Sequence, residues 1–391
     1  MTTVFSRVAP RELVLTLKEL VKIDSVNPLL VPGGAGEAEI AAFVANFLDG
    51  IGLEVELCEV EEGRPNVIGV LRGKGSAPSL ILNGHMDTVG IEGMVDPFVP
   101  RVDGNRLYGR GSADMKGGLA SILHAVKAVV DSGIELSGDL IVASVVDEEY
   151  TSLGTERLMD SFHGDGAVVC EGTGLEIGVA HKGFVWLEVV THGKAAHGSR
   201  PDEGVDAIAK MGSFLFELDD FAKRVLSRRS HELLGSPSLH ASVISGGKEL
   251  STYPDLCRLK LERRTIPGED VVLVQSEILS ILERLSQTDS KFKADLRTIF
   301  SRGPFNVSAE EMVVRSLGKA IRKVSGREPK HIGSYGWLDS EIIQNSGVPT
   351  TIFGPGGEGM HSTNEYVYID QVVEAAMILS QLIVDFCCPS N

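Results

Sequence analysis

Short apolar runs alternate with amphipathic stretches along the first half of the chain. In the amphipathic stretches apolar residues recur at helical spacing, which predicts helices at about residues 11–23, 37–50 and 116–130. The apolar runs between them predict buried strands at residues 79–83, 140–146 and 166–170. Such strands separated by helices are typical of an α/β domain in which helices cover both faces of a parallel or mixed sheet.

The pattern changes after about residue 180. Residues 257–262 alternate apolar and charged side chains, as expected for an antiparallel strand with one exposed face. Further strands are predicted at 183–191 and 239–245, and helices at 204–225 and 269–287. This segment therefore predicts a smaller α+β domain inserted into the larger one.

The helix and strand alternation resumes beyond about residue 300. It predicts a helix at 309–325, a strand at 349–353 and a final helix at 370–386. A chain of 391 residues is also too long for one ordinary core. We therefore predict two domains, one formed by residues 1–180 and 300–391 and the other by residues 181–299.

Charge and hydropathy exclude some classes of partner. The formal net charge is −17, and a negative field repels phosphate, so we expect no nucleic-acid partner. No apolar run reaches the roughly 18 residues that a membrane span needs, and the N-terminus does not resemble a secretory signal. The five cysteines are scattered and include no CxxC pair, which favours a reducing cytoplasm over a disulfide framework.

Acidic and histidine residues follow four of the predicted strands. These residues are His85 and Asp87 after the first strand, Asp147, Glu148 and Glu149 after the second, Glu171 after the third, and His361 after the strand at 349–353. Ligands of open α/β sheets bind at the carboxyl ends of the strands. Chain order therefore predicts that the four clusters lie at one edge of one sheet.

This set of residues suits a divalent metal. Imidazole and carboxylate are zinc ligands, and a bridging carboxylate would let the set hold two ions. A two-metal site that activates water also needs a base, so Glu148 and Glu149 could divide proton transfer and ligation. Asp87, two residues after His85, could support that histidine as an outer carboxylate.

Each residue also has a simpler interpretation. Asp114 lies at a predicted helix start and could cap the helix. Glu148 and Glu149 could be surface charge, Glu171 a loop acid and His361 a turn residue. The coincidence of ligand types with strand ends favours the metal site.

Residues 354–359 match GxGxxG literally. The dinucleotide fingerprint requires a helix that opens at the third glycine, which the following residues do not predict. We interpret these glycines, Gly356 among them, as letting the backbone approach a substrate closely.

The motifs together resemble a known family. They are Gly84–Val89, Gly109–Gly118, Asp147–Glu149, Glu171 and His361. In this combination, over about residues 10–385, the chain is similar to the zinc peptidases and deacylases typified by acetylornithine deacetylase, succinyl-diaminopimelate desuccinylase and glutamate carboxypeptidase. The resemblance implies a catalytic α/β domain with an inserted α+β lid domain that mediates homodimerisation.

The resemblance also assigns roles to residues. His85 and Glu171 would hold one metal, Glu149 and His361 the other, and Asp114 would bridge them. Glu148 would be the general base, and Asp87 would orient His85. From the inserted domain, His197 would reach a partner subunit's site to stabilise the oxyanion, and Arg264 would bind a substrate carboxylate.

We therefore expect an amidohydrolase that carries two divalent metals, with zinc favoured over cobalt or manganese. Its expected substrates are N-acyl amino acids, and a carboxypeptidase or dipeptidase acting on short peptides is the alternative. A non-catalytic relative and a nucleotide-dependent enzyme are less well supported, because all seven core positions are present and the glycine motif lacks its helix.

Overall fold

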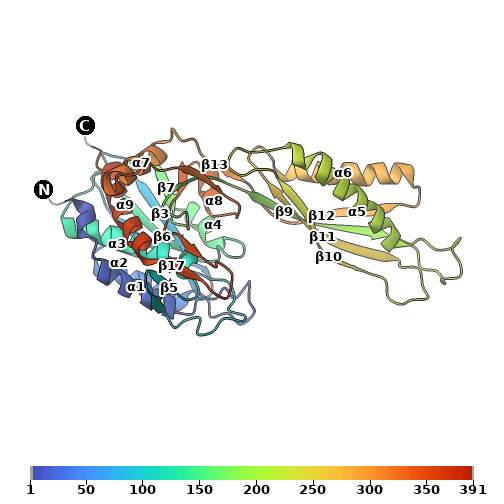
Figure 1. Ribbon diagram of the computed structural model, residues 1–391, viewed down its shortest axis with the longest axis horizontal. Coiled ribbons are helices and arrows are strands. Elements are labelled where there is room, and N and C mark those ends of the chain that lie inside the picture. Colours follow the sequence, from blue (N-terminus) through green and yellow to red (C-terminus); the bar gives the residue numbers. More distant parts are fainter. Residues whose placement is uncertain (1–2, 390–391) are drawn as a thin grey trace. The chain divides into compact units, whose positions relative to one another are not determined.

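The computed structural model describes residues 3–389, and its contacts divide the chain into two compact units. Unit 1 comprises the chain up to Val179, Val307–Ile332 and the chain from Leu338 onwards. Unit 2 comprises Ala180–Asn306 and Gly333–Trp337. Figure 1 labels the elements of both units.

Unit 1 is built on a mixed sheet. Its strands run in the order β1-β2-β6-β3-β7-β15-β8, and β14 also pairs with β8. The short β13, whose two residues belong to unit 2, pairs with Ala180 and His181 at the end of β8. The bounds of these strands are β1 Glu54–Glu61, β2 Arg64–Leu71, β3 Leu80–His85, β6 Leu140–Val145, β7 Gly166–Val169, β8 Ile177–His181, β13 Phe305–Asn306, β14 His331–Ser334 and β15 Thr350–Ile352. The predicted α/β class with a mixed sheet is confirmed.

Four strands at the centre of this sheet are parallel. β3 pairs in parallel with β6 and with β7, and β7 pairs in parallel with β15. The segments that follow these strands therefore leave the sheet at one edge, as chain order predicted. β3 runs through His85, so only Asp87 of the first cluster lies beyond the strand.

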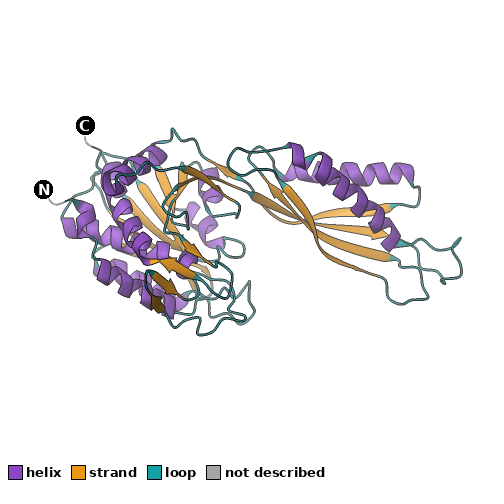
Figure 2. Ribbon diagram, in the orientation of Figure 1, coloured by secondary structure: helices purple, strands orange, loops and turns teal. Residues whose placement is uncertain are grey.

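Helices lie on both sides of the sheet of unit 1 (Figure 2). One side includes a core in which β3, β6 and β7 pack against Leu158 of α4 and Ile343 of α8. The helices of unit 1 are α1 Pro10–Lys22, α2 Ala38–Gly50, α3 Gly117–Ser132, α4 Leu153–Met159, α7 Met312–Ser325, α8 Ser340–Asn345 and α9 Ile369–Cys387, with short turns η1 Val4–Arg7 and η2 Ser112–Lys116. A second small sheet comprises β4 Arg101–Asp103, β5 Arg106–Tyr108, β16 Gly357–Glu358 and β17 Tyr366–Tyr368.

Helix α3 lies very close to the backbone that follows β7. A Cβ atom added at Gly118 would lie 2.0 Å from the carbonyl oxygen of Cys170, so only glycine fits there. The contact brings the start of α3 beside the residue that precedes Glu171.

Unit 2 is an antiparallel sheet with strand order β10-β11-β9-β12. Its core is formed by sheet residues such as Leu187 and Leu261 together with Phe214 and Ile278 from two helices. β10 is an edge strand and is exposed along almost its whole length. The elements are β9 Gly183–His192, β10 Ser238–Gly246, β11 Leu256–Thr265, β12 Lys293–Arg302, α5 Ala207–Arg224, α6 Val271–Thr288 and η3 Leu226–Arg228.

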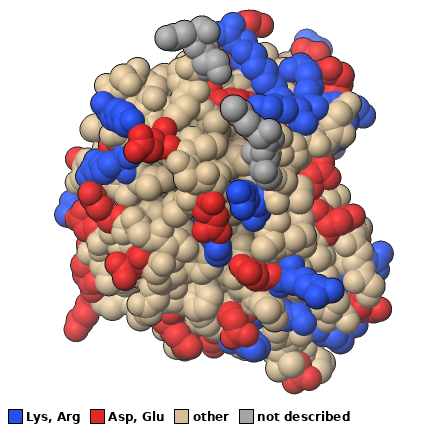
Figure 3. Space-filling model, turned by 90° about the vertical axis from the view of Figure 1, so that its left-hand side faces the viewer, with Lys and Arg blue, Asp and Glu red and all other residues tan. Residues whose placement is uncertain are grey.

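Two features of the structure concern the expectations about nucleic acid and membranes. On the face shown in Figure 3, basic side chains are interspersed with acidic ones. Along residues 3–389, every helix is too short or too polar to cross a bilayer.

Candidate metal centre

Asp114 lies between two histidines that come from distant parts of unit 1. Its Oδ1 is 3.1 Å from Nε2 of His85, at the end of β3, and its Oδ2 is 3.1 Å from Nε2 of His361, in the loop between β16 and β17. Asp114 itself belongs to η2 and has non-helical backbone angles, and the N-cap of α3 is Lys116. The capping interpretation of Asp114 is therefore wrong, and its two oxygens face the two histidines instead.

Each histidine also faces its own glutamate. Oε1 of Glu171 is 3.2 Å from Nε2 of His85, and Oε2 of Glu149 is 3.0 Å from Nε2 of His361. The five side chains therefore form two half-sites that share Asp114. We call them the His85 half-site, with Glu171, and the His361 half-site, with Glu149.

The half-sites fit a tetrahedral metal. Zinc bonds to imidazole nitrogen and carboxylate oxygen at 2.0–2.2 Å, so two such ligands at a tetrahedral angle lie roughly 3.4 Å apart. The nitrogen–oxygen distances of 3.0–3.2 Å come close to this separation. In addition, the buried Oε1 of Glu149 has no hydrogen-bond partner, which leaves it available to a cation.

The electrostatics of the cluster also suit a cation. Burial raises the pKa of Glu149 to about 7, and the negative charge of Asp114 adds to this rise. Hydrogen bonds with Asp114 and Glu149 raise the pKa of His361 to about 10. Burial opposes protonation of His85, yet Asp114, Asp87 and Glu171 together raise its pKa well above 6.5. Protons on the histidines thus offset part of the carboxylate charge, and metal binding would displace them.

Glu148 lies beside the cluster without being as close as the other acids. Its Oε2 is 4.0 Å from Nε2 of His85. Burial raises the pKa of Glu148 well above its ordinary range, and the charges of Asp339 and Glu171 add to the rise while that of His85 opposes it. A carboxyl group with a raised pKa can both accept and return a proton near neutral pH.

Asp87 holds the turn behind the cluster. Its Oδ1 accepts a hydrogen bond from the Glu148 amide at 3.1 Å, and its Oδ2 accepts one from the Glu149 amide at 3.1 Å. The same carboxylate lies 3.4 Å from Nδ1 of His85, whose nearest partner is the Asp87 carbonyl oxygen at 3.0 Å. Asp87 therefore faces His85, and it also fixes the backbone that presents both glutamates.

Sequence reasoning missed Asn27. Its Nδ2 donates to Asp87 Oδ2 at 2.7 Å and to Asp147 Oδ1 at 3.0 Å. Its Oδ1 accepts from two amides in its own loop, so the side chain is fixed at both ends. An Asn before a proline usually indicates only a turn, so the sequence carries no signal for this contact.

His197 and Arg264 belong to unit 2. His197 is exposed, and its Nδ1 lies 2.8 Å from Oγ of Ser199. Arg264 is in β11, where Nε donates to Glu262 at 2.7 Å and the guanidinium lies 5.4 Å from the ring centroid of Phe184. Their predicted roles toward substrate remain predictions.

Gly356 already uses both of its backbone polar groups. Its amide donates to Oε1 of Gln371 at 2.7 Å, and its carbonyl accepts from the Tyr368 amide at 3.0 Å. A Cβ there would lie 2.7 Å from the Gln371 side-chain oxygen and 3.1 Å from Cα of Gly174, so the surroundings are close; the predicted role of Gly356 toward substrate remains a prediction. The GxGxxG segment leads into the short strand β16 and a loop, where the dinucleotide fingerprint requires a helix.

Relatives of known name cover nearly the whole chain. The chain is 31% identical over 409 residues to an N-formyl-4-amino-5-aminomethyl-2-methylpyrimidine deformylase of Bacillus subtilis, covering 96% of this chain and 95% of that protein. It is 32% identical over 386 residues to an acetylornithine deacetylase of Myxococcus xanthus, covering 95% of this chain and 97% of that protein.

Solved structures share the fold. Aminopeptidase PepT of Bacillus cereus aligns with a TM-score of 0.80 at 23% identity, covering 96% of this chain and 98% of that one. The YXEP protein of Bacillus subtilis, described as a dinuclear metal binding peptidase, aligns with a TM-score of 0.76 at 16% identity, covering 97% and 98%. The family model for peptidase family M20/M25/M40 matches residues 81–385. With that match and the two relatives above 30% identity, the chain belongs to peptidase family M20/M25/M40 and is a hydrolase of that family.

Proposed function

We propose that this hydrolase removes the acyl group from N-acyl amino acids, with two zinc ions held by the two half-sites. The observation that carries the proposal is the position of Asp114, whose two oxygens face His85 and His361 at 3.1 Å each. When bound, two divalent metals would activate a water molecule and polarise the scissile carbonyl. The name of the Bacillus subtilis YXEP protein supports a pair of metals.

The residues of the chain would supply proton transfer and orientation. Glu148 would take a proton from the attacking water and return it to the nitrogen of the leaving amine, which its raised pKa favours. Asp87 would keep Nε2 of His85 directed at the cluster through its contacts with Nδ1. Arg264 would bind the carboxylate of the amino acid, for which a guanidinium is suited.

Two relatives favour deacylation over peptide cleavage. The deformylase and the deacetylase, at 31% and 32% identity, both remove small acyl groups according to their names. A carboxypeptidase or dipeptidase activity remains the second candidate, because structures with peptidase names share the fold. A panel of N-acetyl, N-formyl and N-succinyl amino acids and dipeptides, assayed with added zinc, decides between them. Hydrolysis of the dipeptides alone would overturn the deacylase assignment.

The role of Glu148 is tested by Glu148→Gln. We expect turnover to fall by a factor of roughly 10² to 10⁴, since general-base catalysis contributes about that much. Metal content should stay at two equivalents, because Glu148 is farther from His85 than Glu171 and Asp114 are. Glu62→Gln on the surface serves as the control, and unimpaired turnover in Glu148→Gln would remove Glu148 from the mechanism.

We also propose that unit 2 forms a homodimer through its exposed edge strand β10, which would allow the partner subunit's His197 to serve the site. An unpaired edge presents backbone donors and acceptors for a second strand. β10 contains no charged residue that would block such pairing. Sedimentation should give a dimer for the natural chain and a monomer for Val243→Lys. A monomer for both would contradict this proposal.

A further inference from the structure

The buried carboxylate of Glu365, which is not one of the candidate metal ligands, accepts hydrogen bonds from the loop that carries Asp114. Oε2 of Glu365 accepts from Nη1 of Arg110 at 2.7 Å and from the Gly111 amide at 2.9 Å. Its Oε1 accepts from the Ala113 amide at 2.9 Å and from the Asp114 amide at 3.1 Å. Glu365 has no exposed surface, and its four donors all come from residues 110–114.

The same contacts tie together the two segments that present Asp114 and His361. Glu365 lies four residues after His361, and Arg110 lies four residues before Asp114. Arg110 also donates from Nη2 to the carbonyl oxygen of Ser362 at 3.1 Å. The Gly109 amide donates to the carbonyl oxygen of Glu365 at 3.2 Å. The two loops are therefore joined by hydrogen bonds that run from residues 109–114, up to and including Asp114, to residues 362 and 365, just after His361.

We propose that Glu365 is a positioning residue that fixes the Asp114 carboxylate between the two half-sites. This inference rests on the proposed metal site and adds to it a residue that touches neither metal nor substrate. A bridging carboxylate must keep both oxygens directed at two separate ions, so small rotations of its backbone matter. Hydrogen bonds to the backbone amides of Asp114 and Ala113 oppose such rotations. Mutation of residues that hold metal ligands in place, without touching the metal, typically lowers metal affinity by about 10- to 100-fold.

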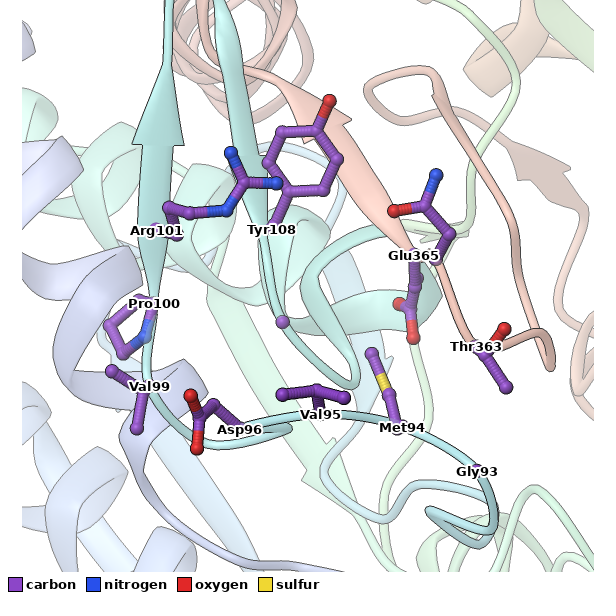
Figure 4. A pocket seen from close by; sticks show the side chains of 12 residues that line it. Gly93, Met94, Val95, Asp96, Val99, Pro100, Arg101, Tyr108, Thr363 and Glu365 are labelled. Atoms are coloured by element: carbon purple, nitrogen blue, oxygen red, sulfur yellow. The ribbon is translucent and has the colours of Figure 1, made fainter.

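The surroundings of Glu365 allow its side chain to be altered without collapse of the loop. Glu365 lines a cavity of about 650 Å³ together with Tyr108, Thr363 and the Gly93–Asp96 segment, as Figure 4 shows. Gln has the size of Glu and fills the same space, and the shorter Asp leaves room for water from this cavity to reach the amides of the loop. We therefore expect the variants below to fold.

The test compares Glu365→Gln with a matched variant in unit 2. Glu269 is similarly buried and accepts from Arg263 and Arg229, at 2.7 Å each, and from the Ile266 amide at 3.2 Å. Glu269→Gln therefore removes the same kinds of interaction away from the ligand set. Zinc stoichiometry and affinity are measured by competition with a chromogenic chelator, and unfolding is followed in parallel. The absorption spectrum of the cobalt-substituted protein reports the ligand geometry.

We expect Glu365→Gln to bind zinc about 10- to 100-fold more weakly and to change the cobalt spectrum, whereas Glu269→Gln keeps the affinity and spectrum of the natural chain. Glu365→Asp, which keeps the charge, should recover part of the affinity, and it replaces Glu365→Gln if that variant does not fold. Natural affinity and spectrum in the Glu365 variants would overturn the inference while leaving the metal site intact. Failure of the natural chain itself to bind two metals would overturn both.

Discussion

The two half-sites use the same ligands and differ in how the protein holds them. His85 ends the buried strand β3, its side chain is 1% exposed, and Asp87 fixes its second nitrogen. His361 lies in a loop with φ +60°, and its side chain is 57% exposed. A ligand already held in place loses little conformational freedom on binding, whereas an exposed one loses more and competes with water. The nitrogen–oxygen distances are similar in the two half-sites, but we expect their metal affinities to differ. The His85 half-site should hold its metal more tightly.

Replacing each histidine tests this comparison most strongly. His85→Ala should weaken binding of the first zinc equivalent by at least roughly 100-fold, since it removes a buried ligand from the tighter half-site. His361→Ala should keep one equivalent with affinity within about 10-fold of the natural value. Chelator titration of the natural chain should likewise remove one equivalent before the other. The exposed His163→Ala is the control, and equal losses in the two variants would break the comparison.

Asn27→Ala should have an intermediate effect. It leaves the buried carboxylates of Asp87 and Asp147 without a shared donor, so we expect a loss of roughly 1–3 kcal/mol in the free energy of unfolding. Zinc affinity should fall mainly at the His85 half-site, which Asp87 supports. Asn66→Ala provides the control, because the buried side chain of Asn66 bonds to backbone groups, the Gly154 carbonyl and the Val146 amide. A larger loss at the His361 half-site would show that Asp87 supports the other side.

The last prediction concerns the pH dependence of stability. Burial lowers the pKa of His124 to about 4, and the charge of Lys127 adds to this. The unfolded chain binds this proton below a pKa of about 6.5 and the folded chain only below about 4, so His124 lowers stability as pH falls through that window. The slope is at most about 1.4 kcal/mol per pH unit.

His124→Gln should flatten this dependence, measured by urea unfolding at pH 4.5, 5.5 and 7 without metal. Because both proteins keep their other carboxylates, the difference between the two curves isolates His124. Identical slopes would show that His124 titrates alike in the folded and unfolded chains.

The positions of the ligands could be predicted because a parallel sheet converts chain order into spatial order. His85 ends a central strand and Glu149 and Glu171 follow two others, so their meeting required only that β3, β6 and β7 be parallel. Asp114 was harder to predict as a ligand, since an acidic residue at a helix start could also cap the helix. Its family resemblance, and then its backbone angles, resolved the two interpretations.

Asp87 was predicted from its spacing to His85, but Glu365 and Asn27 could not be predicted, because their partners are distant in the chain. Glu365 meets the amide of Asp114 across 251 positions, and Asn27 meets Asp147 across 120. No local spacing encodes such pairs. The strands β1 and β12 were also missed, since they alternate charged with apolar residues at the edges of their sheets and are defined by pairing with β2 and β9.

The glycine at position 118 limits which mutations the chain can tolerate. Its missing side chain lets α3 lie against the Cys170 carbonyl, next to Glu171. Every missense change of its codon adds at least one carbon where the gap to that oxygen is 2.0 Å. We therefore expect every missense substitution at position 118 to be damaging, so this position should tolerate mutation as poorly as the catalytic residues do.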